Sequence, residues 1–164
     1  MREDIMKRID ELESRLKVLE DERAILSTLY AYGHTIDYGL KAEWLDCFVE
    51  DAVFKVQMSG VTTGYKGREA LSEFIARHTH APDMWHKHCL VEPIVRLEDN
   101  NKATVASYFA RLDEDENGAY IMAFGRYRDK LVKCEDGKWR FMERIGEIES
   151  RLPKRVQGLT QDGS

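Results

Sequence analysis

The sequence lacks the features that would place it in several large functional classes. No stretch approaches the roughly 18 consecutive apolar residues of a membrane span, and the residues after Met1 are charged instead of apolar. The three cysteines, Cys47, Cys89 and Cys134, lie far apart and include no C-x-x-C pair, which is typical of reduced thiols. We therefore expect a cytoplasmic protein without a membrane contact.

Two further absences narrow the chemistry. The chain has 30 acidic and 25 basic residues, and its net charge of −5 argues against nucleic acid as a partner, because phosphate contacts require a basic face. It also contains no G-x-S-x-G, P-loop or G-x-G-x-x-G motif, so these nucleophile and nucleotide sites are not indicated. Any active site must be built from other groups.

What the sequence does contain is one domain of ordinary length with a helical extension. Its 164 residues suit a single buried core. Apolar residues recur in steps of four and three near the N-terminus, the a/d spacing of a coiled-coil seam: Ile5, Ile9, Leu12, Leu16 and Leu19. This stripe could pack along its own domain, but we favour pairing with a partner subunit. We expect a helical arm at 1–20, the main domain at 21–150 and a loose tail at 151–164.

The order of the expected elements indicates an α+β fold. Helical patterns dominate the first half, at about 4–36, 42–48 and 68–77, with an early strand or two: a strand at 53–57, followed by a turn or short hairpin that Gly60 and Gly64 bracket. The second half alternates β-branched and aromatic residues between turn-forming segments. It predicts four long strands, at 86–97, 102–113, 119–134 and 138–149. Hairpin-sized connections between these strands, such as Asp136-Gly137, favour an antiparallel meander.

Asp37 is the first candidate for chemistry. It stands at the end of the first long helix, where the helix dipole favours a cation over a carboxylate, and the turns before it are apolar. A carboxylate held against an apolar pocket is a candidate for a shifted pKa and for a catalytic role. Spacing alone also allows Asp37 to cap the next helix.

Four of the five histidines fall between positions 78 and 88. On a strand, His86 and His88 would point to the same side. With Glu92 they match part of a metal-ligand pattern, but no histidine follows His88 to complete it, so we expect no metal. The alternatives are a neutral general base held by Asp37, or a pair of histidines with only a packing role.

Several segments, in this order and at these spacings, are similar to one family. They resemble the SnoaL-like branch of the nuclear transport factor 2-like superfamily over roughly residues 20–150. The segments are 30–37 (Tyr-Ala-Tyr-Gly-His-Thr-Ile-Asp), 44–48, 50–54, 65–71, 85–93 (Trp-His-Lys-His-Cys-Leu-Val-Glu-Pro), 125–129 and 136–141, followed by Arg144. The resemblance implies a cone, in which a strongly curved antiparallel sheet packs on three helices and opens at one end to an apolar pocket.

The resemblance also implies a catalytic pair. In eliminating relatives such as scytalone dehydratase, an Asp at the end of the first long helix supports a His on the first long strand. That His removes a proton from a substrate carbon. Asp37 and His88 match these two positions, and His86, which shares the face of His88, is the rival base.

The remaining site residues follow from the same resemblance. Tyr32 matches a polar residue that reaches the substrate in relatives, whereas ideal helix geometry places Tyr30 on the face of Asp37. Phe54 and Trp85 match positions that line the pocket, and Arg144 matches a basic group near it.

A function follows from the resemblance as an expectation. It implies a cofactor-independent lyase of the dehydratase type: His88 removes a proton next to a carbonyl of an apolar cyclic small molecule, Asp37 holds its tautomer and Tyr32 assists the leaving group. An isomerase or a polyketide-type cyclase would use the same dyad. Non-catalytic alternatives are a hydrophobic-ligand-binding protein and a protein like the small subunit of a ring-hydroxylating dioxygenase. Relatives form dimers or trimers, so we expect a homodimer or homotrimer.

Overall fold

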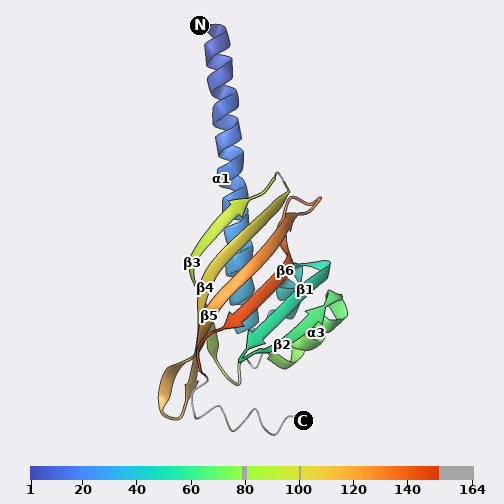
Figure 1. Cartoon of the computed structure of the whole chain (residues 1–164), viewed down its shortest axis with the longest axis vertical. Coiled ribbons are helices and arrows are strands. Elements are labelled where there is room, and N and C mark those ends of the chain that lie inside the picture. The colour runs from blue at the N-terminus through green and yellow to red at the C-terminus, as the bar shows by residue number, and fades with distance from the viewer. Residues whose placement is uncertain (79–80, 100, 152–164) are drawn as a thin grey trace.

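The structure is a computed structural model that describes residues 1–78, 81–99 and 101–151. Beyond Arg151, the expected loose tail lies outside the described residues. No helix in these ranges is long and apolar enough to cross a membrane. The elements (Figure 1) are α1 (Arg2–Asp37), α2 (Lys41–Asp46), β1 (Phe48–Met58), β2 (Val61–Lys66), α3 (Gly67–His78), β3 (His86–Leu97), β4 (Lys102–Asp115), β5 (Gly118–Lys133) and β6 (Trp139–Ile148).

The strands form one curved sheet in the order β2-β1-β6-β5-β4-β3, which confirms the α+β architecture with helices packed on a sheet. The meander from β3 to β6 is antiparallel, as expected. The sheet as a whole is mixed, because β1 pairs with β6 in parallel, with Phe54 opposite Arg144. This pair joins segments at opposite ends of the domain, so no turn signal in the sequence announces it.

A bulge bends the edge strand β3. The pairing register with β4 shifts between Val91 and Ile94, and Glu92 has a positive φ of 51°. Pro93, which has no N–H to donate to a sheet, lies at this bulge on the edge. Bulges of this kind bend a strand and increase its twist, so β3 contributes to the curvature of the sheet.

The second half of α1 supplies the helical side of the core. Ile25, Leu29, Tyr32 and Ile36 follow one another at helical spacing, and each is at most 3% exposed. This stretch packs against the sheet, whereas the N-terminal part of α1 extends beyond it (Figure 1). The packing fixes the C-terminal end of α1, where Asp37 lies, against the sheet.

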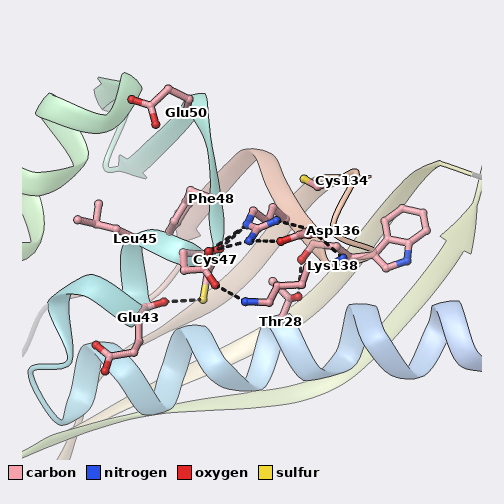
Figure 2. Close-up of polar contacts among 12 residues, drawn as sticks. Thr28, Glu43, Leu45, Cys47, Phe48, Glu50, Cys134, Asp136 and Lys138 are labelled. Atoms are coloured by element: carbon pink, nitrogen blue, oxygen red, sulfur yellow. Dashed lines mark hydrogen bonds and ion pairs between the residues drawn. The ribbon is translucent and has the colours of Figure 1, made fainter.

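Polar contacts anchor α1 and α2 to the β5–β6 hairpin (Figure 2). The Arg140 guanidinium donates to both Asp46 and Asp136, and Lys138 Nζ donates to Asp46 Oδ2 at 2.8 Å. Thr28 Oγ1 on α1 donates to the Trp139 carbonyl at 2.6 Å. These contacts hold the helices on the sheet at the end of β5 and the start of β6, the opposite end of the strands from His86, which pairs with Asp113.

Candidate active site

Asp37 and His88 meet where the end of α1 crosses the beginning of β3. Asp37 is 4% exposed, and its Oδ1 lies 2.6 Å from His88 Nδ1. The backbone N–H of His88 donates to Oδ2 of the same carboxylate at 2.9 Å. The Asp37 carboxylate is thus placed to accept a hydrogen bond from a proton on His88 Nδ1. The other ring nitrogen, Nε2, then has a lone pair with which it can accept a proton.

A glycine lets the two elements come this close. Gly33 lies one helical turn before Asp37, and a Cβ at this position would be 3.2 Å from the carbonyl oxygen of His88. That separation is tighter than an ordinary contact, so a larger residue would push β3 away from α1. Gly33 was not among the expected site residues, because a single glycine within a helical pattern does not show which segment approaches it.

His78 and His86 complete a cluster of three imidazoles with His88. Their ring centroids lie 5.2 Å apart for His86 and His88, 5.5 Å for His78 and His86, and 5.6 Å for His78 and His88. Burial, reinforced by the charge of Arg111, lowers the pKa of His86 to about 4, so this ring is neutral at pH 7. His86 Nε2 is 3.5 Å from Asp37 Oδ1, a longer separation than the His88 contact. The geometry therefore favours His88 as the residue that Asp37 orients.

The same cluster has the composition of a transition-metal site. One ligand atom from each of His78, His86 and His88 lies within 4.8 Å of the others. Neutral imidazoles suit Zn²⁺ and related ions, and Asp37 behind His88 is the kind of carboxylate that orients a metal-bound histidine. His78 was not among the expected site residues, because it ends α3 and only the tertiary fold brings it to β3.

Tyr32 and Arg144 form the floor next to the dyad. The Arg144 guanidinium carbon lies 4.0 Å from the Tyr32 ring centroid and 3.7 Å from that of Tyr127, so the cation contacts the faces of two rings that are inclined to each other by 70°. Burial raises the pKa of Tyr32 well above its usual value, so its hydroxyl remains protonated. Arg144 Nε and Nη1 have no hydrogen-bond partner among the described residues. The floor therefore offers a cation beside a phenol.

Two cavities meet at His88, and both include Tyr32 and Tyr127 in their walls. One, of about 260 Å³, lies between the inner face of the sheet and α3 and is lined largely by aromatic and aliphatic side chains. The other, of about 340 Å³, surrounds the end of α1 and includes Asp37 and Arg144. These volumes suit a small cyclic molecule with one apolar side and a few polar groups.

The remaining expected site residues are only partly gathered here. Phe54 lines the cavity of about 260 Å³ between the sheet and α3. Tyr30 lines the cavity of about 340 Å³ at the end of α1, although Tyr30 is 43% exposed. Trp85 lies outside both cavities: it is 42% exposed, and its ring packs against Tyr38 with centroids 5.6 Å apart. It precedes β3, where the chain has not yet turned into the sheet, so the structure gives it no place in the cavity wall.

Comparison with protein families matches residues 17–145 to the SnoaL-like domain. No curated protein matches the chain. The matched range contains Asp37, His88 and Arg144 and most of the described domain.

Solved structures are similar over most of the chain. An NTF2-like protein with a cystatin-like fold from Novosphingobium aromaticivorans is 23% identical, with a TM-score of 0.76 over 90% of this chain and 94% of that one. A proposed scytalone dehydratase from the same organism is 23% identical, with a TM-score of 0.65 over 83% and 87%. The beta subunit of a proposed aromatic-ring-hydroxylating dioxygenase, again from this organism, is 15% identical, with a TM-score of 0.70 over 82% and 92%. At these identities the similarity shows a shared fold.

Proposed function

Because this chain belongs to the SnoaL-like domain family and its cavity contains a histidine held by a buried carboxylate, we propose that it is a cofactor-independent lyase of the dehydratase type. The observation that carries the proposal is the 2.6 Å contact between Asp37 Oδ1 and His88 Nδ1 at the meeting point of two cavities. A structural role would not require a histidine oriented in this way toward a cavity.

The proposed reaction begins with proton abstraction next to a carbonyl. His88 Nε2 takes the proton, and the C–H electron pair forms the enolate, while Asp37 stabilises the resulting imidazolium. Arg144 and Tyr32, which both line the cavity at the end of α1, favour the negative charge on the enolate oxygen. The enolate then expels the hydroxyl group on the next carbon, and the His88 imidazolium gives its proton to that group, which leaves as water and regenerates the base. The products are an unsaturated carbonyl compound and water.

The cavity suggests the class of substrate. Its inner part is lined by Phe54, Tyr65, Phe74 and Phe109, which favour an apolar ring system. A β-hydroxytetralone combines such a ring system with a carbonyl and a β-hydroxyl, and its dehydration gives a naphthol that is followed by absorbance. We expect the protein to accelerate this dehydration. A rate equal to that in buffer for a panel of such hydroxyketones would contradict the proposed class.

Two other enzyme activities share the first step. An isomerase or a polyketide-type cyclase would also begin by removing a proton next to a carbonyl with His88, and would differ only in the fate of the enolate. Product analysis separates the three: elimination removes one water and leaves a new carbon–carbon double bond, isomerisation leaves the composition unchanged, and cyclisation forms a new carbon–carbon bond that closes a ring.

A dioxygenase small-subunit role is the non-catalytic alternative that an observation favours. The fold is shared with the beta subunit of a proposed dioxygenase. Co-purification with a large iron–sulfur subunit would support this role, whereas turnover by the isolated chain would support the lyase. A ligand-binding protein without turnover would bind cyclic ketones and leave them unchanged.

A homodimer or homotrimer is proposed from the outer face of the sheet. Val91, Ile94, Tyr108 and Phe124 on β3–β5 are between 41% and 60% exposed. A patch of this kind is typical of a protein interface. Sedimentation equilibrium measures the mass directly, and a monomer at all concentrations would contradict this proposal.

Substituting Gly33 with alanine is expected to reduce turnover roughly tenfold, because small displacements of catalytic groups are costly. The added Cβ would press on the His88 carbonyl at 3.2 Å and move the imidazole relative to Asp37. Gly64→Ala is the matched control, since its Cβ would meet only Lys55 Cγ at an ordinary 3.8 Å. Initial rates on β-hydroxytetralone test the pair, and equal rates for the two variants would contradict this role of Gly33.

Metal chelation and metal addition are expected to have opposite consequences. EDTA should leave turnover unchanged, since the proposed reaction uses no metal. Excess Zn²⁺ should inhibit, because binding to His78, His86 and His88 would occupy the base. His78→Asn should reduce this inhibition. His34→Asn should not, since His34 lies outside the cluster, but it lines the cavity at the end of α1, so the inhibition of each variant is expressed relative to its own rate without zinc. Loss of activity in EDTA that is restored by metal would contradict the metal-independent mechanism.

A further inference from the structure

Residues 1–20, which are Met1 and the first part of α1, form an arm that does not pack against the core of the domain. All 20 are exposed, and the arm projects beyond the sheet (Figure 1). Its five seam residues, Ile5, Ile9, Leu12, Leu16 and Leu19, are each 41–61% exposed. A helix of this length is marginal by itself in water, so its apolar stripe calls for a partner.

The seam of apolar a and d residues has a defined C-terminal end. In heptad notation Ile9 and Leu16 occupy a positions, and Ile5, Leu12 and Leu19 occupy d positions. The next a position after the seam is Arg23, whose charge does not suit a buried seam.

At the same point the helix joins its own domain. Asp21 is 5% exposed, and its Oδ1 accepts hydrogen bonds from Lys133 Nζ at 2.6 Å and Trp139 Nε1 at 3.0 Å. The pairing surface therefore ends where the domain's own packing begins.

Charged residues beside the seam favour a second copy of the same helix, aligned in parallel, as the partner. Arg8 and Arg15 occupy g positions, and Glu13 and Glu20 occupy e positions. In a parallel pair each g residue faces the e residue of the following heptad, so Arg8 faces the partner's Glu13 and Arg15 faces the partner's Glu20. An antiparallel pair would instead place Arg opposite Arg and Glu opposite Glu. The arm is thus complementary to a parallel copy of itself.

We propose that residues 5–19 of α1 pair with the same residues of a second copy as a parallel, two-stranded coiled coil. Ile9 at a and Leu12 and Leu19 at d follow the pattern that favours two strands, whereas Leu16 at a and Ile5 at d depart from it, so the native mass of the full chain in solution tests the number of strands. The parallel direction places both cavity-containing domains at the same end of the coil. This contact is separate from the outer face of the sheet, and it does not depend on the proposed lyase activity.

Site-directed crosslinking of the full chain tests the pairing. Ile5→Cys places two thiols at facing d positions in a parallel pair, whereas Lys7→Cys places them at outward f positions. Under mild oxidation, Ile5→Cys should become a covalent dimer, while Lys7→Cys and the unsubstituted chain should remain uncrosslinked. No crosslink with Ile5→Cys, or equal crosslinking of both variants, would overturn the proposal.

Charge reversal tests the register of the two helices, again through the rate of crosslinking at Ile5→Cys. In the Ile5→Cys background, changing Glu13 and Glu20 to arginine should slow crosslinking roughly tenfold, since four favourable pairs become repulsive. Mixing this variant with one carrying Arg8→Glu and Arg15→Glu should restore the rate. An unchanged rate in the first variant, or no restoration on mixing, would contradict the parallel register. A trimeric mass that is lost in the first variant would contradict a two-stranded coil.

Discussion

Replacing Asp37 with asparagine is expected to lower the turnover of β-hydroxytetralone by about 10²–10⁴-fold while the protein remains folded. Asparagine has nearly the same shape but can donate from its amide nitrogen, so His88 Nδ1 can become an acceptor and move its proton to Nε2. A protonated Nε2 cannot take a proton from the substrate. The carboxylate that stabilises the imidazolium is lost as well.

The control is Asp51→Asn, which removes the same charge from an exposed position on β1. It should have the turnover of the unsubstituted protein. Initial rates followed by naphthol absorbance, together with circular dichroism of both variants, complete the test. Full activity in Asp37→Asn would show that the dyad is not catalytic.

Replacing Arg144 with methionine is expected to lower the free energy of unfolding by about 3–5 kcal/mol at pH 8, the usual cost of breaking a buried ion pair. Arg144 is fully buried, and its Nε lies 3.6 Å from Oδ1 of Asp129, which is 2% exposed. Burial raises the pKa of Asp129 to about 7, although Arg144 opposes this rise. At pH 8 the carboxylate is therefore ionised in the folded protein and depends on the guanidinium.

The loss of unfolding free energy in Arg144→Met is expected to increase with pH. A raised folded-state pKa removes stability as pH increases from the unfolded value toward the folded one. In the unsubstituted protein this loss ends near pH 7, where Asp129 ionises. In Arg144→Met the folded Asp129 keeps its proton to higher pH, so the loss continues at about 1.4 kcal/mol per pH unit. The deficit of the variant should therefore be larger at pH 8 than at pH 6.

Urea unfolding at both pH values measures this deficit. The double variant Asp129→Asn with Arg144→Met removes both charges, so its stability relative to the unsubstituted protein should recover at pH 8. Equal deficits at pH 6 and pH 8, or a double variant as unstable as Arg144→Met at pH 8, would show that the ion pair does not account for the loss.

Local sequence patterns predicted most elements well. The strand expected at 86–97 is β3 with the same bounds, and the first helix differs from its expected limits by two residues at the start and one at the end. Periodicity and turn residues determine such segments locally. The strand expected at 53–57 is instead β1, from Phe48 to Met58, because its pairing with β2 and β6 extends it beyond its β-branched centre.

Only those site residues were predictable that match the order and spacing of the family's sequence segments. Asp37 and His88 were paired through the family resemblance, and the structure places them in contact. Tyr32 and Tyr30 both face a cavity, because that cavity wraps around the end of α1 and is not limited to one helix face.

Gly33 and His78 depend on the tertiary approach of α1 and α3 to β3. No local pattern in the sequence records that approach. The placement of Trp85 outside the cavity wall likewise depends on how the chain enters β3, and its sequence neighbours alone do not determine it.

The central claim is that His88, oriented by Asp37, removes a proton next to a carbonyl. Deuterium exchange into α-tetralone in D₂O, followed by proton NMR, measures this step without a leaving group or knowledge of the natural substrate. The unsubstituted protein should accelerate exchange, His88→Gln should exchange no faster than buffer, and His86→Gln should retain most of the acceleration. Exchange by His88→Gln at the rate of the unsubstituted protein would contradict the claim.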